Sequence, residues 1–215
     1  CFTGSVTIVS AQNVEINVRD YTSLQAAIDA IPAAGGIVYF PPGDYAINSS
    51  LRLTTGDVTL RGAGASTVLR NAGRTGNPTI VIDGGTREHT RKNPEDALWR
   101  VQIKDMRFTG ENQIGSAIVA KNINEIFLHN LWIDHHGGTG ILLDECYENP
   151  RISDNNISYN AVAGVKVDAC HDIVISGNEF EENGIGIHAA NGFNATVTGN
   201  NIDDHLGNGV VLDNF

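Results

Sequence analysis

Apolar residues recur along the second half of the chain at intervals of about two dozen positions. Each recurrence opens a short phrase of alternating apolar and polar residues: IKDMRF, LHNLWI, ISDNNI, ISGNEF and VTGNNI. A second phrase, such as GILLD or GVKVD, recurs in step with the first. Two strand-length phrases per repeat predict two stacked parallel β-sheets, because every coil of the chain adds one strand to each sheet. The first phrases begin at Ile103, Leu128, Ile152, Ile175 and Val197, and the second at Gly140, Gly164, Gly186 and Gly209.

The repeat length and the strand pattern together indicate the kind of solenoid. Apolar segments of strand length, without helical spacing between them, predict an all-β, single-stranded parallel β-helix of ~22–25 residues per coil. Leucine-rich repeats are excluded because their Leu/Asn consensus is missing. Asn and Gly at the corners can adopt left-handed backbone conformations and can hydrogen-bond from coil to coil.

The residues before the regular coils predict a strand and a short capping helix. Residues 14–18 alternate like a strand, and Asp20 to Ile31 form an amphipathic pattern with Thr22 and Gln25 at capping-box spacing. A helix here would cover the open end of the solenoid, which otherwise exposes backbone groups and apolar core. Short strands broken by Gly, Pro and Asp follow over residues 37–71. The apolar face of the helix is Leu24, Ala27, Ile28 and Ile31.

No change of composition marks a linker, so residues 1–215 are predicted to form one domain. It comprises the strand and capping helix (1–36), first irregular coils (37–100) and regular coils (101–215). A polar insertion, residues 83–98, interrupts the irregular coils and is expected to project as a loop. The last coil stops at Phe215 without a visible cap. We therefore expect either that more protein follows in the natural polypeptide or that another subunit covers that end, in a trimer or a head-to-tail stack.

The net charge of −11 is unevenly distributed. Residues 1–121 contain 12 Lys and Arg against 11 acids, whereas residues 122–215 contain 2 against 14, a balance of −12. Nucleic-acid binding needs a basic surface and is excluded. No apolar run of 18 residues is present, which excludes a transmembrane helix. The acidic half would repel an anionic polysaccharide unless a bound cation, such as calcium, intervened.

With these coils, the segments INVRDY, LQAAIDAIPAAGGIVYFPPGDYAI and VTLRGAG make the chain similar to the pectate-lyase-like superfamily of right-handed β-helices. The resemblance spans nearly the whole chain. It implies the fold and a polymeric glycan as partner, in an extracellular, cell-surface or virion-associated location. It does not select an activity, because the superfamily includes lyases, hydrolases, uronan epimerases, phage tailspikes and non-enzymatic adhesins.

The second phrase predicts the one place where register brings acid, base and cation together. Strand alternation turns the residue after each Gly inward and the next one outward. Stacking of coils then forms a column containing Asp144, Asp168 and Asp213 beside a column containing Lys166 and His188. Asp144, Lys166, Asp168 and His188 are therefore the candidate catalytic residues.

Two kinds of catalytic chemistry fit these residues, and a third interpretation gives them no catalytic role. Asp144 and Asp168, about 5 Å apart, match a retaining glycosidase pair, while Asp168 and Asp213, about 9.6 Å apart, match an inverting one. Like charges so close would raise the pKa of one carboxyl and suit it to act as a general acid. Alternatively, Lys166 or His188 abstracts a proton α to a uronate carboxylate, which a bound cation acidifies. The plain structural reading is a set of surface ion pairs.

Two activities of the superfamily cannot be transferred to this chain. Similar uronan epimerases have Asp-Pro-His after the corresponding Gly phrase, whereas this chain has Asp144-Glu145-Cys146, without the histidine. Asp203-Asp204 is similar to the paired aspartates of polygalacturonase-like hydrolases, but the other motifs of that family are absent.

The insertion supplies the basic residues that could bind an acidic sugar. In β-helix enzymes such loops wall the substrate groove, although a plain solvated loop is an equal alternative. The candidate substrate-binding residues are Arg87, His89, Arg91 and Lys92, with Arg151 and Asp213 from the regular coils.

Two further groups of residues have weaker chemical readings. Asp134-His135 and Asp203-Asp204 are weak metal-ligand candidates at equivalent corners three coils apart. Roughly 14 Å of separation prevents them from sharing one ion, and solvated corners are the alternative. Cys146 and Cys170 occupy matching corners within disulfide range, and stacked inward-facing thiols fit equally well.

Two functions therefore remain open. The first is a polysaccharide lyase or glycoside hydrolase with its groove over the Lys166 and His188 face. The second is a non-catalytic glycan-binding or structural module, such as a tailspike segment, an adhesin or a filament subunit.

Overall fold

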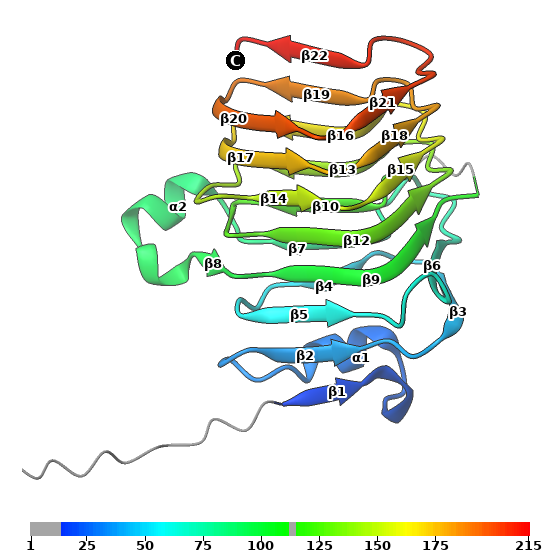
Figure 1. Cartoon of the computed structure of the whole chain (residues 1–215). Coiled ribbons are helices and arrows are strands. Elements are labelled where there is room, and N and C mark those ends of the chain that lie inside the picture. Colours follow the sequence, from blue (N-terminus) through cyan, green and yellow to red (C-terminus); the bar gives the residue numbers. More distant parts are fainter. Residues whose placement is uncertain (1–13, 112–114) are drawn as a thin grey trace, which may run out of the picture.

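Parallel strands stack coil upon coil along one axis in the computed structural model, which describes residues 14–111 and 115–215 (Figure 1). Within these residues the strands form a 13-stranded sheet, named sheet A here, and a 7-stranded sheet, named sheet B. Every strand pair between coils is parallel. The predicted all-β parallel β-helix is confirmed.

Sheet A lies in front of sheet B in the view of Figure 1. Sheet A contains β1 (Glu15–Asn17), β2 (Gly36–Tyr39), β3 (Gly43–Ile47), β5 (Val58–Arg61), β6 (Thr67–Asn71), β9 (Gln102–Thr109), β12 (Phe127–Asp134), β14 (Arg151–Ser153), β15 (Asn156–Ser158), β17 (His171–Ser176), β18 (Glu179–Glu181), β20 (Phe193–Thr198) and β21 (Asn201–Asp203). Sheet B contains β4 (Leu51–Leu53), β7 (Ile80–Asp83), β10 (Ile118–Lys121), β13 (Thr139–Asp144), β16 (Ala163–Asp168), β19 (Ile187–Ala190) and β22 (Val210–Asp213). A further pair joins β8 (Leu98–Trp99) to β11 (Ile123–Asn124).

The observed register follows the repeat in the sequence. Leu128 pairs with Ile103 on one side and with Ile152 on the other, and the series continues to Ile175 and Val197. In sheet B the residues after each Gly also align. The side chains predicted to point inward are buried: Ile141, Leu143, Val165, Val167, Ile187 and Ala189.

The two predicted parallel sheets are present, but sheet A contains more strand segments than the one per coil that the phrases predicted. Sheet A bends in each regular coil, and in the last three coils the bend divides its strand into two segments, as in β14 and β15. Asp154, between them, has a left-handed backbone with φ of 57°. The polar residues within segments such as ISDNNI therefore form a turn, as short polar residues can.

A ladder of buried asparagines holds this bend together. The Asn155 Nδ2 donates to Asn178 Oδ1 at 2.9 Å, and Asn178 Nδ2 donates to Asn200 Oδ1 at 2.9 Å. Each amide also donates to a backbone carbonyl of the preceding coil. These bonds satisfy backbone groups that the bend removes from the sheet ladder, as the structural reading of the Asn repeat predicts.

Helix α1 (Leu24–Asp29) lies at the N-terminal end beside the first coil (Figure 1). Its cap is Ser23, whose hydroxyl accepts from the Ala26 N–H at 3.1 Å, so the predicted capping role of Thr22 was wrong. Gln25 instead pairs with the edge of sheet B, because its amide both donates to Arg52 O (2.9 Å) and accepts from Arg52 N (2.8 Å). A side chain thus occupies the strand edge that the helix was predicted to cover. A short 3₁₀ helix, Val18–Asp20, precedes it.

The two ends of the core differ. One continuous cluster of buried apolar residues extends from Ile16 to Ala189. In the last coil Val210 and Leu212, predicted to line the core, are 44% and 63% exposed, because β22 pairs with β19 on one side alone. Ala190, predicted to point to solvent, is buried. In the described residues, no helix has the length and apolar character needed to span a bilayer.

Candidate functional site

The polar insertion folds into a short helix beside the β-helix (Figure 1). Helix α2 (Arg87–Lys92) follows β7 directly and is capped by Thr86, whose hydroxyl accepts from the His89 N–H at 3.3 Å. A 3₁₀ turn, Pro94–Asp96, then leads back to β8. Thr90 anchors the helix through a hydrogen bond between its hydroxyl and the Asn122 amide at 3.1 Å. The insertion is therefore an ordered segment that packs beside the coils of the β-helix.

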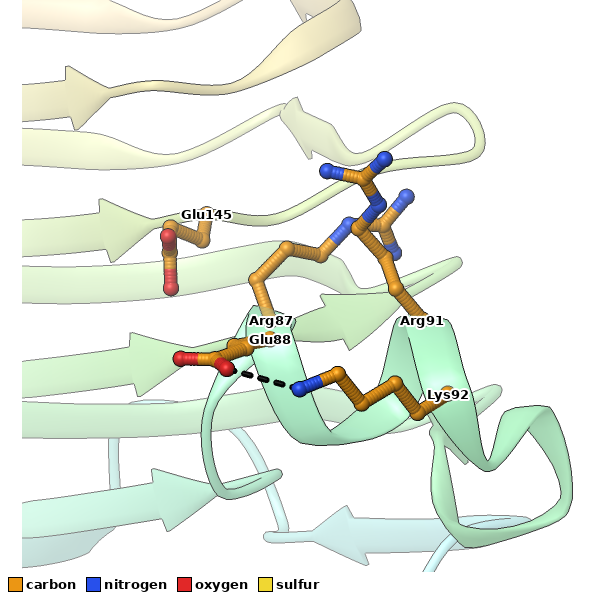
Figure 2. A pocket seen from close by; sticks show the side chains of 5 residues that line it. All are labelled: Arg87, Glu88, Arg91, Lys92 and Glu145. Atoms are coloured by element: carbon orange, nitrogen blue, oxygen red, sulfur yellow. Dashed lines mark hydrogen bonds and ion pairs between the residues drawn. The ribbon is translucent and has the colours of Figure 1, made fainter.

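A pocket of about 510 Å³ opens between α2 and the body of the β-helix. Figure 2 shows Arg87 and Arg91 extending to the same side of the helix, with Glu145 on the neighbouring corner after β13 and its carboxylate turned away from both guanidiniums. Because Glu145 directly follows Asp144, the pocket adjoins the C-terminal ends of the sheet B strands. The lining residues are Arg87, Glu88, Arg91, Lys92 and Glu145.

The cations of α2 differ in what they contact. Lys92 is paired with Glu88 at 2.8 Å, as the dashed line in Figure 2 marks. The Arg87 guanidinium carbon lies 4.1 Å from the centre of the Tyr147 ring. Within residues 14–111 and 115–215, neither Arg87 nor Arg91 has a carboxylate within ion-pair distance. Two guanidiniums on one side of a helix form a site suited to an anion.

His89 does not belong to this pocket. Its Nε2 lies 2.7 Å from Asp96 Oδ2, and its Nδ1 lies 3.4 Å from the Asn93 amide, both within the insertion. Arg151 is also remote, because it lies on sheet A, where its guanidinium carbon is 5.8 Å from the Phe127 ring centre. The structure therefore brings together Arg87, Arg91 and Lys92 of the predicted substrate-binding residues.

The outer face of sheet B has the predicted columns. Asp144 pairs in register with Asp168, and Lys166 pairs with His188 in the next strand. Asp168 pairs in register with Ala190, which pairs with Asp213, so Asp213 lies two strands beyond Asp168 in the same column. All four candidate catalytic side chains thus lie on one face, beside the α2 pocket but outside its lining.

Charged groups on this face are paired. Lys121 Nζ lies 3.4 Å from Asp144 Oδ2, Lys166 Nζ lies 3.3 Å from Asp168 Oδ2, and His188 Nε2 lies 2.8 Å from Asp213 Oδ2. This pattern is what the reading as surface ion pairs predicts. It also leaves the His188 ring oriented by a carboxylate, an arrangement that suits a general base.

Sequence reasoning missed the first two members of the acidic column. Lys121 and Asp83 extend it in register below Asp144, and Asp83 accepts from Arg52 Nη2 at 2.7 Å. The signal was present, because IVID and IVAK have the alternation of the later phrases but lack the leading Gly. The column therefore contains one cation, Lys121, among four acids and Ala190.

Asp168 does not have the raised pKa expected of a general acid. The Asn191 amide donates to its Oδ1 at 2.9 Å, and this bond, with the Lys166 ammonium, holds the pKa of Asp168 below its usual range. Burial opposes the effect but does not overcome it. Asp168 is therefore a permanently ionised carboxylate near neutral pH.

The weak metal candidates have other partners. Asp134 receives hydrogen bonds from Arg107 at 2.7 and 3.0 Å, from Thr109 at 2.7 Å and from His135 at 2.9 Å. Burial raises the pKa of Asp134, but the bonds from these three residues outweigh it and leave a net lowering. Asp203 and Asp204 lie three strands away, as predicted. No three acidic, His or Cys side chains converge as a metal site in the described part of the chain. The residues present do not fit the suggested calcium ion.

The two cysteines of the repeat are stacked thiols. Cys146 and Cys170 are buried and free, and the Cys170 Sγ accepts from the Cys146 N–H at 3.2 Å. Burial raises the pKa of the Cys146 thiol well above its usual value. Of the two arrangements left open by the sequence, the inward-facing one is present, and the thiol is unreactive.

Two layers of parallel strands, stacked coil upon coil, define the class of protein as a parallel β-helix. The chain belongs to the family described as the right handed beta helix region, whose model matches residues 47–214. No sequence among curated proteins matches significantly.

Solved structures of several β-helix proteins are similar to this chain. ORF18 of Geobacillus virus E2 has a TM-score of 0.72 and 19% identity, over 86% of this chain and 40% of that one. The catalytic unit of a GH87 α-1,3-glucanase from Streptomyces thermodiastaticus has 0.64 and 21%, over 91% and 42%. The A-module of the Azotobacter vinelandii mannuronan C-5 epimerase AlgE6 has 0.58 and 18%, over 92% and 72%. The chain thus spans less than half of the first two, and these likenesses show the fold.

Proposed function

We propose that this chain binds an acidic polysaccharide between α2 and sheet B and cleaves it by β-elimination, outside the cytoplasm. The observation that supports the proposal most strongly is the pair of guanidiniums, Arg87 and Arg91, beside the ion-paired face. A guanidinium matches a carboxylate in shape and charge. The likeness to a glucanase and a mannuronan epimerase agrees with a glycan substrate.

The position of α2 explains how a chain with an acidic surface could bind an acidic polymer. Residues 122–215 hold 14 acids against 2 cations, and such a surface repels a polyanion. The arginines of α2 supply positive charge at one edge of this surface, where a uronate unit would be held. Neighbouring units of the polymer would then lie along sheet B, parallel to the axis of the solenoid.

The paired residues of sheet B suit β-elimination better than hydrolysis. Asp168 is held ionised, whereas hydrolysis needs a protonated carboxyl as general acid. In β-elimination, His188, oriented by Asp213, would take the proton from the carbon that bears the carboxylate. The electron pair of the broken C–H bond forms a carbon–carbon double bond while the adjacent bond to the glycosidic oxygen breaks, and the leaving oxygen takes a proton from water. Lys166 would neutralise the carboxylate of the reacting unit.

A set of soluble polyuronates, including polygalacturonate and alginate, tests this proposal. Cleavage produces an unsaturated sugar whose absorbance rises in the ultraviolet, and it should disappear in His188→Ala. The double variant Arg87→Ala/Arg91→Ala should raise KM while leaving the fold intact. Lys104→Ala, which removes a cation from sheet A, is the matched control and should retain activity. No cleavage of any polyuronate would overturn the enzymatic part.

A second function is favoured by one observation. Asp144 and Asp168 each pair with a lysine, and Asp213 is hydrogen-bonded to His188, as expected of a surface without chemistry. The same pocket would then serve a non-catalytic glycan-binding module. If an acidic glycan binds, if this binding requires Arg87 and Arg91, and if no product is released, the chain has this second, non-catalytic function. A trimer or head-to-tail stack stays a prediction, which size measurement in solution tests.

A further inference from the structure

A second hollow lies on the outer side of the bend in sheet A, away from α2 and sheet B. Two adjoining depressions, of about 380 and 370 Å³, share Asn130 as a lining residue. Together they extend from Tyr39 in the second strand to Asn201 in β21. We call the part from Asn130 to Asn201 the bend groove. It has no residue in common with the α2 pocket.

Strand register makes the bend groove run along the axis of the solenoid. Trp132 pairs with Asn156, Asn156 with Glu179, and Glu179 with Asn201. Neighbouring strands are about 4.8 Å apart, so these four side chains span about 14 Å in a straight line. A repeated set of polar groups along a straight groove matches a linear polymer.

The bend itself keeps this groove open. Asn130, Asp154, Gly177 and Gly199 occupy equivalent turns, with φ of 53°, 57°, 68° and 63°. The last two have no side chain, and a Cβ added at Gly199 would meet nothing nearer than 3.9 Å. The groove therefore has open space at Gly199, before β21, whereas the Asp154 carboxylate lies beside Gly177.

The chemistry of the lining points to a neutral sugar. Trp132 is half-buried and offers an aromatic surface, against which the apolar face of a sugar ring can pack. Asn156 and Asp154 are exposed, and Asn201 donates to Glu179 at 2.7 Å. Amide and carboxylate groups can bind hydroxyls. Among the described residues lining the bend groove there is no Lys or Arg, so nothing there would neutralise an acidic sugar.

We propose that the bend groove binds a neutral polysaccharide chain, with Trp132 as its aromatic platform. The site is independent of the acidic-glycan pocket and of any chemistry on sheet B. The protein would then hold two glycans of different charge on two faces. A neutral chain in the bend groove would hold the protein on a glycan matrix while the α2 pocket engages the acidic polymer.

Tryptophan fluorescence provides a direct test, because the chain has two tryptophans, Trp99 and Trp132. In Trp99→Phe, Trp132 becomes the only tryptophan, and excitation near 295 nm avoids the tyrosines. We expect neutral oligosaccharides of the α-1,3-, β-1,3- and β-1,4-glucan types to shift its emission saturably. Calorimetry on Trp132→Ala should show affinity reduced roughly tenfold for the responding glycan.

Two variants separate this site from the α2 pocket and from loss of fold. Gly199→Asn fills the open end with a residue that tolerates the left-handed backbone, and should lose binding without a change in Tm. Arg87→Ala/Arg91→Ala should bind the neutral glycan with unchanged affinity, even if the acidic-glycan proposal fails. No saturable response from any neutral glycan, a response only to polyuronates, or full binding by Gly199→Asn would overturn the proposal.

Discussion

The Arg87 guanidinium of the insertion stacks on the ring of Tyr147, with 4.1 Å between its central carbon and the ring centre. Tyr147 lies at the corner after β13, and its ring also contacts the His171 ring at a centroid distance of 4.4 Å. A residue of the irregular coils is thereby positioned by a residue of the regular coils. Arg87 in turn lines the pocket beside α2.

Tyr147→Ala should weaken binding of an acidic oligosaccharide by about two- to fivefold. The physical reason is loss of the cation–π contact that orients Arg87, worth about 0.5–1 kcal/mol at a partly exposed site. Tyr147→Phe retains the ring and is the matched control, so its affinity should equal that of the wild type. Titration calorimetry measures both, and equal affinities of the Ala and Phe variants would show that the contact does not orient Arg87.

Lys166→Ala should reduce polyuronate cleavage strongly while changing the free energy of unfolding by less than about 1 kcal/mol. Partly exposed ion pairs contribute little to stability, and Asp168 keeps its bond from Asn191. Activity and chemical denaturation are measured on the same preparation. A variant that loses stability and activity together would indicate a purely structural lysine.

Asn155→Ala should lower the free energy of unfolding by about 2–4 kcal/mol, because two buried backbone groups lose their partners. These are the Leu131 N–H, which donates to Asn155 Oδ1 at 2.9 Å, and the Leu128 carbonyl, which accepts from Nδ2 at 3.1 Å. The adjacent Asn156→Ala is the control. Its side chain is exposed, so its effect should stay within about 0.5 kcal/mol. Similar urea midpoints for the two variants would contradict the role of the ladder.

Acid should destabilise the protein partly through His136. Burial lowers the pKa of this histidine to about 4 from an ordinary 6.5. A lowered folded-state pKa means that the unfolded chain binds the proton more tightly. Stability is therefore intact above pH 6.5 and falls as the pH drops toward 4, by about 3 kcal/mol from this group.

His136→Asn removes this titration and introduces the residue type that Asn160 supplies at the equivalent position of the next coil. Denaturation at pH 7 and pH 4 should show a smaller loss of stability in the variant than in the wild type. An identical pH dependence would mean that other groups cause the acid effect.

Chelation should leave polyuronate cleavage and thermal stability unchanged. Asp134 already accepts bonds from Arg107, Thr109 and His135, and the described residues contain no cluster of three metal-binding side chains. Assays and melting curves with EDTA or with added calcium test this. A calcium-dependent activity would place an ion between the substrate and the sheet B carboxylates.

The fold could be predicted from the sequence because strand alternation and a repeat of fixed length act together. Once Leu128 lies above Ile103, every residue of the coil has a defined neighbour, so the pairings of Asp144 with Asp168 and of Lys166 with His188 followed. The third strand segment was missed because its turn, around Asp154, lies inside a phrase of strand length. The Ser23 cap was missed because Thr22 has the same chemistry and better spacing to Gln25.

What the sequence determined by itself is thus the solenoid, its register and the residues that face outward on sheet B, since these depend on local alternation and on one repeat. The tertiary structure decided the rest. It placed Arg87 and Arg91 against a corner formed much later in the chain, directed His89 to Asp96 and left Arg151 on the other sheet. It also formed the bend groove beside Trp132. An insertion has no repeat to fix its position, and its packing depends on contacts between residues that no local pattern relates.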